Sequence, residues 1–183
     1  MGDVIRDGTG KSYLAGVNSK NRLLSECITY SGEHTANHED GNAYNMLFEK
    51  TPATAGDCFL YLKNGDTIDL IIEGVWLRVA SAEQVTIKLN DVGTPVDGTA
   101  VTPANLNAGA NSAALGTFQS GSAITGLSGG TIINKIWATS TETSFFNFEQ
   151  DVIVSPNLVF TAYAITGGVE LDGTIAFNYH SHV

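Results

Sequence analysis

The sequence predicts an all-β fold, a jelly-roll-like antiparallel β-sandwich with an extended N-terminal arm. Three observations lead to this prediction. Apolar and polar residues alternate over several short stretches, and turn-forming residues separate them, including 20 Gly in 183 residues. No stretch shows the sustained 3.6-residue apolar period of a capped helix. About eight strands spaced by roughly 10–12 residues are typical of a sandwich or closed barrel, and the long connections favour a jelly roll.

The strand pattern is clearest in residues 57–90. Phe59, Tyr61 and Lys63 alternate with Cys58, Leu60 and Leu62. The sequence Asn64-Gly65-Asp66 follows directly. Because Asn and Gly tolerate a positive φ, this sequence gives the signal of a short hairpin. A second hairpin signal lies at Gly167-Gly168.

The phase of the alternation reverses after Gly74. Val75 and Leu77 form the apolar set beyond this point, and Trp76 and Arg78 alternate with them. A reversal of phase at a glycine indicates a β-bulge or a sharp bend between two sheets.

Residues 91–130 differ from the rest of the chain because they carry no basic residue and only two acidic ones. Gly, Ala, Ser, Thr and Asn dominate, so we expect long loops with one or two short strands. Strand patterns return in four later segments, namely 131–139, 145–154, 157–165 and 169–180.

The length of the chain fits a single sandwich domain, which we place at residues 23–183. Residues 1–22 are polar without a sustained period, so we expect an extended arm. The first 25 residues carry four basic and two acidic side chains, whereas the remainder carries five and seventeen. Two interpretations stay open: the arm docks on an acidic surface, or the imbalance is scatter in a solvated tail.

Charge and hydropathy argue against several partners. A formal net charge of −10 should repel phosphate backbones, so we expect no nucleic-acid partner. The chain lacks the run of roughly 18 apolar residues that a membrane span requires. Residues 1–6 do not form a signal peptide, which predicts synthesis in a cytoplasm. Cys27 and Cys58 form no CxxC pair, and Cys58 is expected to be a buried free thiol.

The sequence contains catalytic motifs only in incomplete form. Residues 8–12, Gly-Thr-Gly-Lys-Ser, look like the end of a phosphate-binding loop, but Ile5 stands where the pattern requires glycine. Glu142 and Glu149 offer the two carboxylates of a glycosidase, but their settings are those of ordinary strand ends. We therefore predict that the protein is not an enzyme and has no cofactor.

All four histidines fall into two pairs, His34 with His38 and His180 with His182. Either pair could supply two imidazoles to a metal, although exposed histidines in a loop and near a C-terminus are the commoner case. We predict no metal site and leave the two pairs open.

Aromatic residues could form a surface for a ligand or a subunit. Phe145 and Phe146 are adjacent, so one of them should point outward from the sandwich as a candidate subunit contact. The alternatives are a sugar-binding platform or packing in the core and between subunits, for Trp76, Trp137, Phe145, Phe146 and Phe148.

Five short motifs occur in a familiar order: Asp7-Gly8-Thr9-Gly10, Val17-Asn18, Asn21-Arg22-Leu23, residues 41–45 (Gly-Asn-Ala-Tyr-Asn) and residues 102–107 (Thr-Pro-Ala-Asn-Leu-Asn). In this order they resemble the small decoration or cement proteins that stabilise the capsids of tailed bacteriophages. The similarity spans most of the chain in outline, and the order and spacing of the motifs carry it.

The resemblance implies a jelly-roll sandwich, often a homotrimer, on the outer surface of a virion, bound to the lattice of the major capsid protein. It implies neither enzyme activity nor a cofactor. Related proteins often carry a basic residue just after the Asn-Leu-Asn step, where this chain has Ala108. The residues expected at the capsid or subunit interface are Arg6, Lys11, Asn21 and Arg22 in the arm, and Thr102, Pro103, Asn105, Leu106 and Asn107 in an ordered loop.

Two other functions remain as alternatives. A receptor- or glycan-binding module of a virion fibre or tip would use the exposed aromatics and the 91–130 loops. A small metal enzyme on a β-sandwich would use His34, His38 and one further ligand.

Overall fold

The computed structural model describes residues 16–17, 23–24, 37, 41–140 and 142–180. The chain divides into two compact units, Met1–Ser31 and Gly32–Val183. In the first unit, β1 (Gly16–Val17) pairs antiparallel with β2 (Leu23–Leu24). The rest of the predicted arm, including Arg6, Lys11, Asn21 and Arg22, lies outside the described residues.

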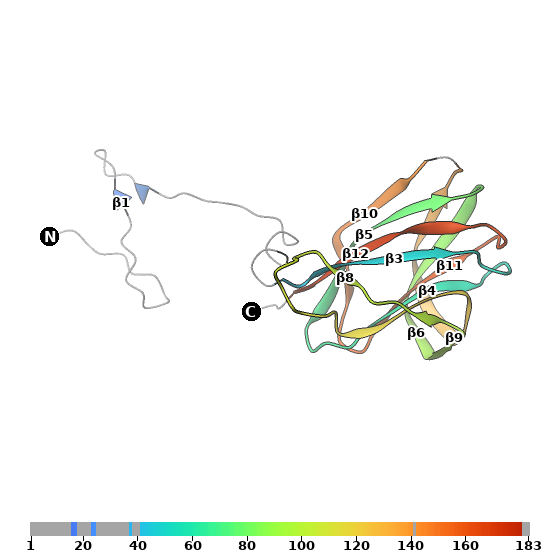
Figure 1. Cartoon of the computed structure of the whole chain (residues 1–183), viewed down its shortest axis with the longest axis horizontal. Helices are drawn as coiled ribbons and strands as arrows, with labels where there is room; N and C mark the ends of the chain where they lie inside the picture. Colours follow the sequence, from blue (N-terminus) through green and yellow to red (C-terminus); the bar gives the residue numbers. More distant parts are fainter. Residues whose placement is uncertain (1–15, 18–22, 25–36, 38–40, 141, 181–183) are drawn as a thin grey trace. The chain divides into compact units, whose positions relative to one another are not determined.

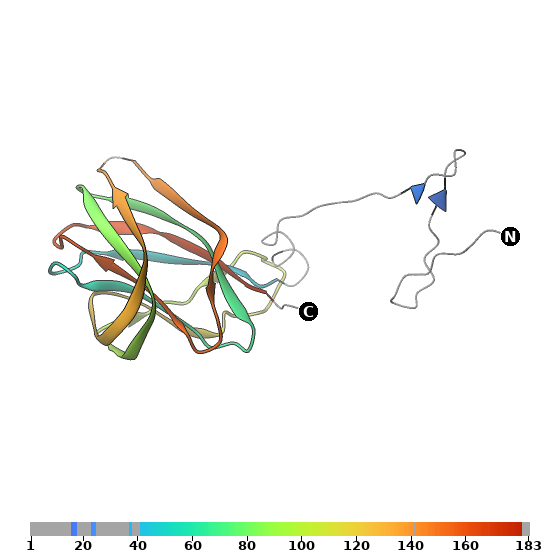
Figure 2. The same cartoon turned by 180° about the vertical axis from the view of Figure 1, so that it is seen from behind.

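The second unit is an antiparallel β-sandwich, as predicted (Figure 1; Figure 2). The β5 sheet has the order β10 (Ser144–Val154), β5 (Asp69–Val79), β12 (Leu171–His180), β3 (Ala43–Lys50) and β8 (Ala104–Asn105). The β6 sheet has the order β4 (Cys58–Asn64), β11 (Val159–Ala164), β6 (Glu83–Val96), β9 (Gly116–Ala138) and β7 (Thr99–Ala100).

The connectivity of the eight long strands is that of a jelly roll. Each long strand lies in the opposite sheet from its predecessor, except β9, which pairs directly with β6. The β5 sheet therefore contains the first, third, sixth and eighth long strands, and the β6 sheet contains the other four. This order confirms the predicted jelly-roll-like sandwich.

The two predicted hairpins are wrong. Asn64-Gly65-Asp66 joins β4 to β5, which lie in different sheets, and Gly167-Gly168 likewise lies between β11 and β12. At the first corner the buried Asn64 amide donates to Ile68 O and Val154 O, both at 2.8 Å. A side chain that bonds to β10 at the end of β4 directs the chain across to the other sheet.

Side chains from the inner faces of both sheets form the main core. Aromatic rings stack in it, and Phe177 lies 5.4 Å from Phe118 and 5.6 Å from Tyr44 between ring centroids. The predicted change of phase at Gly74 is confirmed, because the pairing of β12 with β5 shifts register there. The shift allows the residues on both sides of it to present apolar side chains inward.

The prediction of long loops over residues 91–130 is wrong in large part. β6 continues to Val96, and β9 already begins at Gly116. Asn90, with φ 64°, marks the point where β6 leaves β11 and continues paired with β9 alone. We call this paired extension, residues 91–96 of β6 with 125–129 of β9, the ribbon.

Strand β9 closes the β6 sheet on itself. The first half of β9 pairs with β4 and its second half with β6, while β11 joins β4 to β6. A second, smaller apolar cluster is enclosed by this circuit, composed of Cys58, Tyr61, Ile124 and Val159, with Leu127 and Tyr163 packed against it.

Candidate functional site

The segment from Thr102 to Asn107, which contains β8, is held by hydrogen bonds of its own side chains. Asn105 Nδ2 donates to Gly41 O at 2.7 Å and to Ser112 O at 3.0 Å, and its Oδ1 accepts from Asn107 N at 2.7 Å. These bonds join the loop to the segment just before β3. Thr102 and Leu106 are exposed, whereas Pro103, Asn105 and Asn107 are half-buried. Their proposed contact with a capsid or subunit stays a prediction.

The histidine pairs are largely outside the described part of the chain. His34, His38 and His182 lie beyond it, and His180 ends β12 opposite Asp69. Among the described residues no group of three or more His, Cys, Asp or Glu side chains could hold a metal ion.

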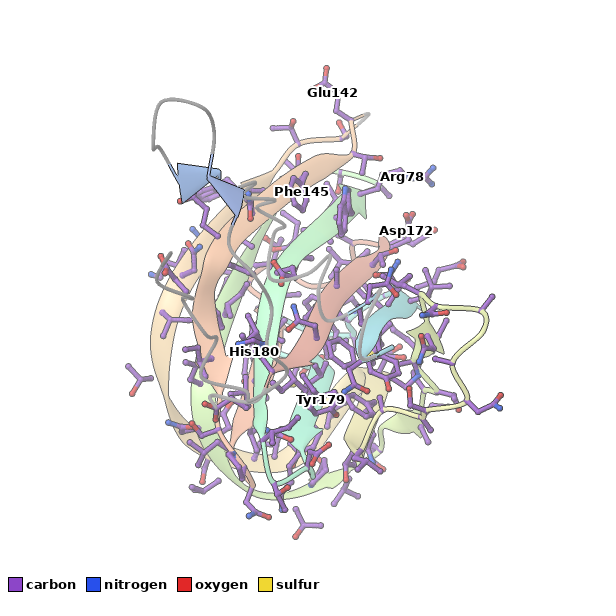
Figure 3. All side chains as sticks on the ribbon, turned by 90° about the vertical axis from the view of Figure 1, so that its left-hand side faces the viewer. Arg78, Glu142, Phe145, Asp172, Tyr179 and His180 are labelled. Carbon is purple, nitrogen blue, oxygen red and sulfur yellow. The ribbon has the colours of Figure 1, made fainter. Side chains whose placement is uncertain are left out.

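The proposed carboxylate pair is exposed. Glu142 precedes β10, and Glu149 lies within it at φ 52°. Figure 3 shows Glu142 toward the end of the β5 sheet opposite His180.

The five aromatic residues do not form one platform. Phe148 is buried, Phe146 packs against the main core, and Trp137 lies on β9 in the other sheet. Trp76 and Phe145 do come together on the outer face of the β5 sheet, with ring centroids 4.3 Å apart and planes 21° from parallel. Phe145 is therefore the predicted outward-facing member of its pair.

Polar groups flank this aromatic pair. Two residues beyond Trp76, Arg78 Nε donates to Asp172 Oδ2 at 3.0 Å, and Asp172 faces Glu49 across the β12–β3 pairing. A shallow hollow of about 420 Å³ lies over β3 and β12 beside them. We call this surface the aromatic row; it consists of Trp76, Phe145, Arg78, Asp172 and Glu49. Figure 3 shows Phe145, Arg78 and Asp172 toward one end of the β5 sheet.

A second surface lies where the two sheets expose an edge strand. No described strand pairs with the outer side of β9 over residues 125–138 or with that of β10. Trp137 is 69% exposed there, Ile132 52% and Ile133 40%, and Lys135 is the only charged residue in that part of β9. A hollow of about 320 Å³, lined by residues of β6, β9 and β10, lies beside Ile133. We call this surface the β9–β10 side.

A buried polar network joins the ribbon to the β6 sheet. Asp91, just after Asn90, accepts hydrogen bonds on Oδ2 from Thr161 Oγ1 at 2.5 Å and from Tyr163 Oη at 2.7 Å. Its Oδ1 is buried and accepts no hydrogen bond from the described residues. The carboxylate thus holds the first residue of the ribbon to β11.

Burial in this region raises the pKa of a neighbouring thiol and of two tyrosine hydroxyl groups. Desolvation raises the pKa of the free Cys58 thiol to about 12. It also raises the pKa of Tyr61 and of Tyr163, and the hydrogen bond to Asp91 adds to the rise for Tyr163. A thiol that stays protonated is a poor nucleophile, so Cys58 acts as a buried apolar side chain, as predicted.

Sequence reasoning missed Asp91, the Arg78–Asp172 ion pair and the exposed Ile132 and Ile133. Asp91 and its partner Thr161, like Arg78 and Asp172, lie far apart in the sequence and meet only in the folded chain. One signal was present for β9, because Ile132-Ile133 and Trp137 stand in a nearly uncharged segment.

Comparison with known proteins finds no family model, curated protein or solved structure that matches this chain. In the described part of the chain, no helix has the length and apolar character needed to cross a membrane.

Proposed function

We propose that the chain is a structural protein of a bacteriophage virion that decorates the capsid as a homotrimer bound to the lattice of the major capsid protein. The observation that carries the proposal is the β9–β10 side, which combines unpaired strand edges with exposed large apolar side chains. The order of the turn-rich motifs supports the same function. In this proposal the protein is not an enzyme and needs no cofactor.

An exposed apolar edge strand is a liability unless another chain covers it. Its free N–H and C=O groups recruit further strands, and natural proteins usually protect such edges with charge or proline. Residues 125–138 have one lysine and no proline. A neighbouring subunit or capsid protein that pairs with β9 would satisfy these groups and bury Trp137 at the same time.

Composition points to a protein partner at this surface. The core of a protein interface is poor in charge and rich in aromatic residues, with the largest energies at buried Trp, Tyr and Arg. The exposed Trp137, Ile132 and Ile133 fit this description, and Ile133 also lines a hollow.

Binding to capsids tests the proposal directly. The full chain, a variant lacking residues 1–22 and Trp137→Glu are each mixed with capsids of the parent phage that lack the protein, and occupancy is measured by cryo-electron microscopy. We expect full occupancy for the full chain and loss for both variants, with unchanged circular dichroism. Absence of the full chain from the capsid surface would contradict the proposal, and normal occupancy by the shortened chain would remove the arm from it.

A further inference from the structure

We propose that the aromatic row binds a neutral carbohydrate, with one sugar ring stacked against Trp76 and its hydroxyl groups bonded by Arg78, Asp172 and Glu49. This site is independent of the proposed docking surface on the β9–β10 side. The partner is identified by chemistry: a ring with an apolar face and a periphery of hydroxyl groups.

The aromatic pair is fixed in place by the backbone. Phe145 is opposite Trp76 in the β10–β5 register, and its ring leans over Gly74. A Cβ on Gly74 would lie 2.6 Å from the Phe145 ring and 2.6 Å from Phe146 O, so only glycine permits this position. Phe145 covers one face of the indole and stiffens it. A binding surface that is already ordered loses less entropy when it binds a ligand.

Hydrogen-bonding groups lie at the right place for a ring stacked on the indole. Residues two apart on a strand share a face and stand roughly 6.6–6.8 Å apart, which places Arg78 beside Trp76 on the side away from Gly74. Arg78 is 59% exposed and uses Nε for Asp172, so its other N–H groups are accessible. An arginine paired with a carboxylate offers donors and acceptors together, which hydroxyl groups need.

The hollow beside the row gives a sugar ring room to enter. The hollow has a volume of about 420 Å³ and is open to solvent, so a sugar ring can lie along the face of the sheet there. Four residues that line the hollow are cross-strand neighbours of the site. Thr174 lies opposite Trp76, and Leu47 lies opposite Thr174. Asp172 lies between Arg78 and Glu49 in the same way. The surface thus places the apolar side chains of Trp76 and Leu47 beside the polar side chains of Asp172 and Glu49. A sugar ring likewise has an apolar face and a periphery of hydroxyl groups.

The pattern favours a carbohydrate over a protein partner. The apolar part of this surface, Phe145, Trp76 and Leu47, is one residue wide along the strands. The residues on either side of it are polar or small, including Asn147 and Asn45. A stable protein interface buries roughly 800 Å² on each partner around an apolar core, which one such row does not supply. The two carboxylates and the net charge of −10 favour a neutral sugar over an acidic one.

Fluorescence of Trp76 gives a direct test. The chain has two tryptophans, so Trp137→Phe leaves Trp76 as the sole reporter. This protein is titrated with neutral oligosaccharides of glucose, galactose and mannose, and with oligogalacturonate as the acidic counterpart. We expect a saturable shift in emission with at least one neutral oligosaccharide, and affinity at least about tenfold weaker for the acidic one.

Matched variants locate the site. In the Trp137→Phe protein, Glu49→Gln and Arg78→Gln should each weaken binding by about tenfold. Glu170→Gln, an exposed carboxylate outside the row, should leave it unchanged. Three results would each overturn the proposal: no saturable shift with any neutral oligosaccharide, equal binding by all three variants, or a change of mass in solution caused by Arg78→Gln, which would make the row a subunit contact.

Discussion

The β9–β10 side and the aromatic row each expose a tryptophan, but the surroundings of the two tryptophans differ. Trp137 stands with Ile132, Ile133 and a single lysine on an edge that no described strand pairs. Trp76 stands inside a paired sheet, stacked on Phe145 and beside an ion pair. An apolar edge with free backbone groups suits a protein chain, whereas an aromatic ring bordered by polar side chains suits a hydroxylated ring.

The largest effect should come from a charge on the β9–β10 side. Trp137→Glu places an unpaired carboxylate in the proposed interface and should weaken self-association by 2–4 kcal/mol, about thirtyfold to a thousandfold. Sedimentation equilibrium measures it. Phe145→Ser, on the aromatic row, is the matched control and should leave self-association within about threefold. Equal effects of the two variants would remove the distinction between the surfaces.

The attachment of the ribbon should be the next most sensitive point. Asp91→Asn weakens the buried hydrogen bond from Thr161 and the half-buried one from Tyr163. It also places an NH₂ group where Oδ1 is buried, so the variant should lose about 1–3 kcal/mol of unfolding free energy. Urea denaturation measures it. Asp97→Asn is the control, because Asp97 accepts an exposed bond from Thr125 and should change stability by less than about 0.5 kcal/mol.

The position of Phe145 can be tested at Gly74. Gly74→Ala introduces a methyl group into the space of the Phe145 ring and should cost about 1–3 kcal/mol, because the backbone at Phe146 limits relaxation. Adding Phe145→Ala should recover part of this loss, since the ring is then gone. Additive losses in the double variant, measured by urea denaturation, would show that Gly74 does not act through Phe145.

The smallest expected effect is a loss of the stability contributed by Cys58 at alkaline pH. The pKa of Cys58 rises from 9.0 to about 12 on folding, so its stabilising effect is complete below pH 9 and is lost as pH rises from about 9 to 12. The stability difference between wild type and Cys58→Ala should therefore shrink by on the order of 1 kcal/mol between pH 8 and pH 10. A constant difference across this range would contradict the buried, protonated thiol.

Much of the fold could be predicted from alternation alone, because a strand with one buried face must alternate. The bulge at Gly74, the outward Trp76 and the late strands follow from that rule. Asn64-Gly65-Asp66 shows where it fails, since the same residues make a hairpin or a corner between sheets. The choice depends on Val154 O, a partner 90 residues away that accepts from the Asn64 amide.

The candidate surfaces were harder to predict. A single exposed ring could be expected at Phe145-Phe146, but the stack on Trp76 depends on the register of β10 with β5. The ribbon was read as loops because Gly and Ser weaken the strand signal. Pairing with β6 and the Asp91 bonds to β11 keep these residues in a strand despite their low propensity.

The mass of the purified full chain in solution tests the central claim most directly, when it is measured by light scattering beside the Trp137→Glu variant. One chain has a mass of 19.3 kDa, so a homotrimer has three times that mass, about 58 kDa. We predict about 58 kDa for the wild type and a shift toward 19.3 kDa for the variant. A wild-type mass of 19.3 kDa at micromolar concentration, or a variant that keeps the trimer mass, would contradict the assignment of the β9–β10 side as the surface of assembly.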